Sequence, residues 1–239
     1  MKYVLGIDIG TGSVKAVSVD LQFKSVETSQ HYYPFNSPKP GYHEQDPEQI
    51  WEAFIGCIKE AIHKTKGQPL AISLSSAMHS LLPVDKNGNP LAPMMTWADG
   101  RSSDIAQKLQ QSAEGLAIYN ATGTPLHAMS PLCKLIWIKE NQPDLLKKAH
   151  KFISIKEYLW YKLFQEYKID HSIASCTGLF DINNLTWHKA ALALIGINED
   201  VLSEPVSTSY TKEFKAGNQN PALDFLQAGI QFVIGASDG

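Results

Sequence analysis

The sequence predicts an α/β fold in which helices flank a mixed β-sheet. Three strand-like runs, at 3–9, 14–19 and 24–33, follow one another without an intervening helix. A capped amphipathic helix begins at Pro47, and two further apolar strands, at 70–76 and 230–235, are separated by helical segments. Consecutive strands followed by a helix and then by more strands and helices favour a sheet that contains antiparallel pairs and carries helices on its faces.

The first three strands differ in character. Residues 3–9 are apolar and β-branched, whereas 24–33 are more polar and are expected nearer a sheet edge. Residues 14–19 alternate with period two, which places Lys15, Val17 and Val19 on one face of the strand. The opposite face of that strand would carry Val14, Ala16 and Ser18.

The remaining elements are predicted from caps, turns and helical periodicity. Asp46 can cap a helix whose first position is Pro47, with apolar residues along one face. Asn87-Gly88 predicts the turn of a hairpin over 80–97. Helices are expected at 102–117, 131–141, 154–164 and 188–195, and a loop or short hairpin at 177–187. Ser154 and Glu157 are spaced as a capping box.

Composition excludes several classes of protein. The chain has 239 residues, 44% of them hydrophobic, and a net charge of −3, so no basic surface is available for nucleic acid. The three cysteines are far apart and lack the spacing of metal ligands, which favours reduced thiols. Asp8 interrupts the N-terminal apolar run that a signal peptide needs, and no apolar run approaches about 18 residues. We therefore expect a cytoplasmic protein without membrane segments.

Two aspartates stand at the ends of strands beside glycine-rich turns. Asp8 precedes Gly-Thr-Gly-Ser, and Asp238 follows the last apolar strand. The first turn lacks the lysine ending of a Walker loop and leads into a strand, but its N–H groups can still face a phosphate, with Lys15 close by. Two carboxylates in this setting suit phosphoryl transfer, one organising Mg²⁺ and the other accepting a hydroxyl proton. The alternative is a pair of ordinary turns.

Four segments, in order, resemble the FGGY carbohydrate kinases of the actin-like ATPase superfamily. DIGTGSVK (8–15) resembles that family's first phosphate-binding hairpin, and MSPLCKLIWIKEN (129–141) resembles its first signature. The segment 76–102 resembles the sugar-binding hairpin, and GASDG (235–239) the turn with the catalytic aspartate. The resemblance implies a ribonuclease H-like domain. Within the family, four segments look most like gluconokinases: AMHS (77–80), TWADGRS (96–102), FISIKEYLWYKLF (152–164) and SIASCTGLFD (172–181).

The resemblance also implies roles for individual residues. Asp238 would be the catalytic base, and Asp8 would bind Mg²⁺ and ATP together with Thr11, Gly12, Ser13 and Lys15. The implied substrate contacts are Met78, His79, Trp97, His127 and Met129. Purely structural roles stay open as alternatives: His79 as a half-buried histidine with its hydrogen bonds made within the protein, Asp99 and Arg101 as a local ion pair, and Lys134 as part of a helix that serves packing.

The implied activity is transfer of the ATP γ-phosphate to a sugar or sugar acid. D-gluconate to 6-phosphogluconate is favoured, a xylulokinase-like activity is the nearest alternative, and a non-catalytic actin-like ATP- or sugar-binding module is the alternative class. A substrate carboxylate would need a cation or N–H donors, for which His79, Lys134 and Arg101 are candidates. We expect residues 1–239 to be an N-terminal, sugar-binding domain. Without a C-terminal nucleotide-binding domain it would fold, be inactive, and expose apolar surface through which a homodimer could form.

Overall fold

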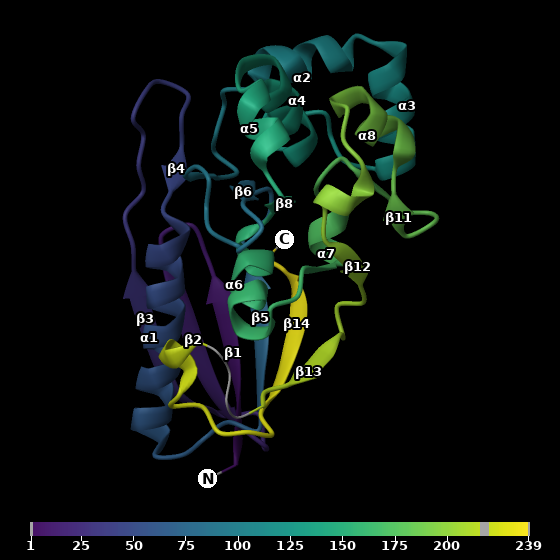
Figure 1. The fold of residues 1–239 in the computed structure, drawn as a ribbon. Coiled ribbons are helices and arrows are strands. Elements are labelled where there is room, and N and C mark those ends of the chain that lie inside the picture. Colours follow the sequence, from purple (N-terminus) through teal and green to yellow (C-terminus); the bar gives the residue numbers. More distant parts are fainter. Residues whose placement is uncertain (1, 216–219, 239) are drawn as a thin grey trace.

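The computed structural model describes residues 2–215 and 220–238. Gly239, where the predicted domain and the GASDG segment end, lies outside the described residues. A six-stranded sheet forms the lower part of the molecule in Figure 1, and helices and short strands form the upper part. The strand order is β13-β14-β5-β1-β2-β3, with β1 (Tyr3–Ile9), β2 (Ser13–Asp20), β3 (Ser25–Tyr32), β5 (Ala71–Ser76), β13 (Thr211–Glu213) and β14 (Gln231–Ser237).

The sheet is mixed, as predicted. β1, β2 and β3 pair antiparallel, whereas β5 pairs parallel with both β1 and β14. Because of these two parallel pairings, β1, β5 and β14 run in the same direction and end at the same edge of the sheet; helical segments lie in the connections, as parallel pairing requires. Their carboxyl ends point toward the helical part of the molecule (Figure 1).

One face of the sheet carries the core, and the other carries the polar groups. Along β1 the side chains of Tyr3, Leu5, Ile7 and Ile9 are buried, while Asp8 points to the exposed face. The buried face packs against α1 (Pro47–Thr65) and α6 (Ile155–Phe164), which lie together in front of the sheet in Figure 1. Period-two alternation therefore separates the core from the chemistry within a single strand.

The two covering helices begin where their capping residues predict. Asp46 accepts a hydrogen bond from the Glu48 N–H, and Pro47 occupies the first turn of α1. At α6, Ser154 and Glu157 form the complete capping box, each accepting from the other's backbone N–H. These contacts satisfy N–H groups that the helix itself leaves without partners.

The helical part has its own apolar core. Its helices are α2 (Ser103–Gln110), α3 (Ala113–Thr122), α4 (Pro131–Asn141), α5 (Pro143–Lys148), α7 (His171–Ser175) and α8 (Lys189–Ile195). Short strand pairs connect the segments: β4 (Glu44–Gln45) with β7 (Met94–Met95), β6 (Leu82–Val84) with β8 (Lys151–Ile153), β9 (Lys168–Asp170) with β12 (Glu204–Val206), and β10 (Phe180–Asp181) with β11 (Thr186–Trp187). Single 3₁₀ turns lie at Glu199–Val201 and Pro221–Leu223.

Two predicted elements need correction. The helix expected at 102–117 is two helices, because Ser112 caps α3 by accepting the Gly115 N–H, and a Cβ at Gly115 would lie 2.0 Å from the Leu109 carbonyl oxygen. The hairpin expected over 80–97 has its turn at Asn87-Gly88, but its arms meet only at isolated bridges. Prolines at 83, 90 and 93 remove the N–H donors that longer pairing requires.

The last strand extends to Ser237, two residues beyond the prediction, and so carries Asp238 to the sheet edge. None of the helices in the described ranges combines the length and apolar character that crossing a membrane would require.

Candidate active site

Two carboxylates lie at the edge where β1, β5 and β14 end. Asp8 projects from β1, and Asp238 follows β14 with its N–H donating to the Ser76 carbonyl at 3.1 Å. Burial raises the pKa of Asp8, and the negative charge of Asp238 raises it further; Lys15 and the Ser75 hydroxyl oppose this shift. The predicted pair of aspartates is therefore brought together at the carboxyl ends of parallel strands, where ligands bind in α/β sheets.

The carboxylate pair fits a magnesium ion that is shared with phosphate. Within residues 2–215 and 220–238, no group of three or more His, Cys, Asp or Glu side chains could enclose a metal. Mg²⁺ is usually held by one or two carboxylates, waters and substrate phosphates rather than by a protein cage. Asp8, whose charge is disfavoured by its neighbour Asp238, is the residue that a cation would stabilise.

The turn between β1 and β2 offers backbone donors. Gly10 N–H donates to the Ser13 carbonyl at 3.0 Å and closes the turn. In the described part of the chain, no hydrogen bond engages the N–H groups of Thr11 or Gly12. Two adjacent unengaged N–H groups lie near Lys15, which is paired with Asp8 in the β1–β2 register, and they can donate to a phosphate.

Contacts from distant segments hold this turn in place. The Thr11 hydroxyl accepts from Trp97 Nε1 at 2.9 Å, and the Thr11 carbonyl accepts from Gln45 Nε2 at 2.5 Å. Two further bonds run from Gln30 Nε2 to the Ser13 hydroxyl and from the Tyr33 hydroxyl to the Gly10 carbonyl. Sequence reasoning missed Gln45, Gln30 and Tyr33, because nothing in the local sequence indicates their long-range partners.

Three of the predicted phosphate- and sugar-binding residues line one small pocket: Thr11, Met78 and Trp97. Gly10, next to Thr11 in the turn, also belongs to the lining. Trp97 is 50% exposed, so its ring face is available to a ligand while its Nε1 is bound to Thr11. The hairpin turn and the sugar-side residues are therefore parts of a single site rather than two separate features.

His79 is neutral and presents an acceptor. It is 9% exposed, and its Nδ1 lies 2.9 Å from the Cys176 carbonyl, so Nδ1 carries the proton and donates. Burial lowers the pKa of His79, and the Lys134 charge lowers it further, while the bond to Cys176 opposes both. A neutral ring with Nδ1 protonated has a free lone pair on Nε2, which suits a sugar hydroxyl.

His127 and Met129 lie in the loop before α4. The Met129 N–H donates to His127 Nδ1 at 3.2 Å, which leaves Nε2 to carry the proton of the neutral ring. The His127 side chain is exposed, and it lies close enough to His79 for an electrostatic interaction. The loop thus brings a donor to the region where His79 offers an acceptor.

Arg101 belongs to a buried ion-pair network and is not free to bind a substrate carboxylate. Its side chain is 4% exposed and pairs with Asp99 at 2.8 Å and with Glu44 at 2.5 Å. The guanidinium also lies 3.8 Å from the ring centroid of Tyr42. The local ion-pair interpretation of Asp99 and Arg101 is confirmed. Because Arg101 is almost fully buried and its Nε and Nη2 groups already donate to Asp99 and Glu44, we do not assign it to a substrate carboxylate.

The end of β14 is anchored by a buried ion pair that sequence reasoning missed. Lys156 and Asp170 are each 1% exposed and pair at 2.7 Å, and Lys156 Nζ also donates to the Ala236 carbonyl at 2.8 Å. A lysine among Ile155, Tyr158 and other apolar residues of α6 was the available signal. The pair fixes the backbone two residues before Asp238.

Ser172 continues this anchor. Its hydroxyl donates to Asp170 Oδ1 at 2.6 Å and accepts the Ser237 N–H at 2.7 Å. Asp170 also caps α7 by accepting the N–H groups of Ser172 and Ile173. The segment with Asp238 is therefore tied to α6 and α7 as well as to β5.

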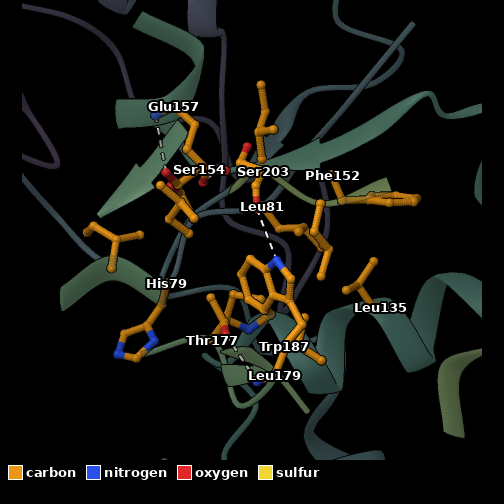
Figure 2. A pocket seen from close by; sticks show the side chains of 16 residues that line it. His79, Leu81, Leu135, Phe152, Ser154, Glu157, Thr177, Leu179, Trp187 and Ser203 are labelled. Atoms are coloured by element: carbon orange, nitrogen blue, oxygen red, sulfur yellow. Dashed lines mark hydrogen bonds between the residues drawn. The ribbon is translucent and has the colours of Figure 1, made fainter. Parts of the chain in front are cut away.

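A second, mostly apolar pocket adjoins the candidate site and shares His79 with it. Figure 2 shows its lining, where the Trp187 indole crosses the space and its Nε1 donates to the Ser203 carbonyl at 3.0 Å. The lining includes His79 but neither aspartate nor Thr11, and most of it is apolar. Trp187 is buried, as are Trp51 and Trp160 in the other core.

Comparisons with known proteins agree with this geometry. Residues 3–239 match the FGGY family of carbohydrate kinases, N-terminal domain. The chain is 42% identical over 239 residues to the gluconokinase of Bacillus subtilis (strain 168), covering 99% of this chain and 46% of that protein. It is 31% identical to the xylulose kinase of Staphylococcus xylosus over 87% of this chain and 43% of that protein.

The fold has close counterparts among solved structures. Gluconate kinase and ligand-bound xylulose kinase, both from Lactobacillus acidophilus, superpose with TM-scores of 0.94 at 31% identity, covering 100% of this chain and 48% and 49% of theirs. The predicted ribonuclease H-like α/β class is thereby confirmed. The chain spans about half the length of the relatives it matches. By its sequence match and its fold, this chain belongs to the FGGY family of carbohydrate kinases, as an N-terminal domain of that family.

Proposed function

We propose that this chain is the sugar-binding half of an ATP-dependent kinase that converts D-gluconate to 6-phosphogluconate. The observation that carries the proposal is the close pair of Asp8 and Asp238 beside a turn with unengaged N–H groups. The resemblance to gluconokinases at 42% and 41% identity supports the choice of substrate. A second domain of the same polypeptide would supply the adenosine site, and a cytoplasmic location is part of the proposal.

The chemistry assigns one task to each carboxylate. Asp238 accepts the proton of a primary hydroxyl as its oxygen forms a bond to the γ-phosphorus. The bond from that phosphorus to the bridging oxygen breaks, and ADP leaves. Asp8 would hold Mg²⁺, which neutralises phosphate charge when bound. Thr11, Gly12, Ser13 and Lys15 would cradle phosphate oxygens through N–H, hydroxyl and ammonium donors.

The substrate would be held between Trp97 and the segment at 78–79. The ring face of Trp97 and the Met78 side chain provide apolar contact, and His79 Nε2 accepts from a hydroxyl. His127 is our proposed partner for the carboxylate of gluconate, because its exposed Nε2 is a donor, whereas Arg101 is already paired. Met129 positions His127 through its backbone N–H.

The substrate proposal is tested by measuring kcat/KM of the full-length protein with ATP and D-gluconate, D-xylulose or glycerol. We expect gluconate to give the highest value. Xylulose is the second candidate, because the ligand-bound xylulose kinase superposes as well as the gluconate kinase does. Higher efficiency with xylulose would contradict the substrate but not the phosphoryl-transfer centre.

The role of His127 is tested with the same two substrates. His127→Ala should lower kcat/KM for gluconate by about tenfold, the scale of one hydrogen bond to a charged group. The value for xylulose, which has no carboxylate, should change by less than about threefold. Equal losses for both substrates would contradict carboxylate binding by His127.

The two-domain proposal is tested on residues 1–239 alone. Without a second domain, the triphosphate would contact only the Asp8 region and the 11–15 turn, and water would reach the site. We expect no sugar-dependent ADP release by this segment in a coupled assay. Release at the rate of the full-length protein would require an adenosine site within this chain.

A further inference from the structure

Lys134 in α4 is a buried lysine whose ammonium group reaches two carbonyls near the candidate site. The residue is 0% exposed. Its Nζ donates to the carbonyl of His79 at 2.5 Å and to that of Thr96 at 2.7 Å. These carbonyls belong to two segments that line the pocket on its sugar side, and Thr96 directly precedes Trp97.

Full burial is energetically unfavourable for a lysine, so its retention here indicates that the contacts with the two carbonyls have a role. Burial lowers the pKa of Lys134 to about 7, with the negative charge of Asp99 opposing the shift. An apolar side chain of similar length would avoid this desolvation. A neutral amine still has two N–H donors for two carbonyls, so the contacts are satisfied on either side of this pKa.

The carbonyl of His79 has a defined direction because of the backbone at this residue. His79 has φ of 65°, a left-handed conformation that is uncommon for a residue with a side chain. Lys134 binds the carbonyl on one side, and the Cys176 carbonyl binds Nδ1 on the other. The two contacts together stabilise a strained residue at the pocket.

We propose that Lys134 is a positioning residue that fixes the spacing between His79 and Trp97 by binding the carbonyls of His79 and Thr96. The proposal rests on the proposed function, since it assigns these two residues to the sugar side of a kinase site. Lys134 does not itself touch substrate, because it is fully buried and its Nζ is bound to two backbone carbonyls. This also corrects Lys134 as a candidate for binding a substrate carboxylate.

The first test compares Lys134→Met with Lys139→Met in the full-length protein. Lys139 is a matched control: it lies in the same helix and its Nζ also donates to a carbonyl, that of Leu194 at 2.7 Å, but on the exposed side. Lys134→Met should raise KM for the sugar about 10- to 100-fold, the scale of a small misplacement of binding groups. KM for ATP should change by less than about threefold, and Lys139→Met should change neither.

The split between the two KM values separates positioning from general destabilisation. Equal changes in both, or an unchanged KM for the sugar, would overturn the proposal. If Lys134→Met does not fold, Lys134→Arg serves in its place. Arginine keeps N–H donors, but its guanidinium is larger than the lysine ammonium and cannot occupy the same position between the two carbonyls. A folded Lys134→Arg variant with the original KM for the sugar would also overturn the proposal.

A second measurement does not depend on the reaction that the protein catalyses. A crystal structure of ligand-free Lys134→Met, or of Lys134→Arg, reports the distance from Trp97 Nε1 to the Thr11 hydroxyl, which is 2.9 Å here. We expect this contact to be lost and the His79 carbonyl to turn. An unchanged contact would overturn the role of Lys134 even if the substrate were different, whereas a wild-type protein that phosphorylates no sugar would contradict only the proposed function.

Discussion

Adding a methyl group at Gly235 in β14 should destabilise the folded chain. Its φ is +69°, and a Cβ built there would lie 1.8 Å from the Leu74 carbonyl oxygen on β5. The left-handed conformation costs a side chain about 1–2 kcal/mol, and displacing one strand against the next adds about 1–3 kcal/mol. Gly235→Ala should therefore lower the free energy of unfolding by about 2–5 kcal/mol.

The assay is urea unfolding of this chain, with Gly6→Ala as the matched control. Gly6 lies in β1 of the same sheet, and a Cβ added there would meet no atom within 4 Å. Alanine in a strand interior is about 0.5–1 kcal/mol more favourable than glycine, so the control should be unchanged or slightly more stable. The midpoint for Gly235→Ala should fall while the slope m stays constant. Equal midpoints for the two variants would refute the close approach of β14 to β5.

Further predictions concern buried charges and the Trp97 contact. Burial raises the pKa of Glu157 to about 7, so the free energy of unfolding should fall by at most about 3 kcal/mol as the pH rises from about 4.5 to 7. In thermal unfolding, Glu157→Gln should therefore be more stable than the original chain at pH 8 and similar to it at pH 4. Lys156→Met leaves the buried Asp170 without its cationic partner and should lower the free energy of unfolding by about 3–5 kcal/mol, measured by urea unfolding; a loss below about 1 kcal/mol would contradict the ion pair. Trp97→Phe keeps a ring but removes the bond to Thr11, and steady-state kinetics should show kcat/KM reduced about 2- to 10-fold; an unchanged value would make that bond irrelevant.

Elements with local signals were predictable from the sequence. The helix at 131–141 begins at a proline after the capping Ser130 and matches its predicted bounds. The first strand, 3–9, also matches, because its alternation and the Gly-Thr-Gly-Ser turn are both encoded within a few residues. Asp8 and Asp238 were predicted from their places at strand ends, and the parallel pairing through β5 brings them together.

The supporting contacts were not predictable, because their partners are far away in sequence. Lys134 binds carbonyls 38 and 55 residues away, and Lys156 binds the Ala236 carbonyl 80 residues away. Nothing in a local pattern shows that a lysine on an apolar helix face has carbonyl acceptors in the fold. Arg101 illustrates the converse, since its compact spacing from Asp99 indicated an ion pair but not Glu44 and Tyr42, which complete the network.

The central claim, that Asp238 is the base of a phosphoryl-transfer site built around Asp8, is tested most directly by kcat of Asp238→Asn in the full-length protein. The exposed Asp144→Asn is the control, and circular dichroism checks that each variant is folded. We expect Asp238→Asn to lower kcat for sugar phosphorylation about 10²- to 10⁴-fold, the scale of losing a general base, with Asp144→Asn unchanged. A folded Asp238→Asn variant with near-normal turnover would contradict the claim.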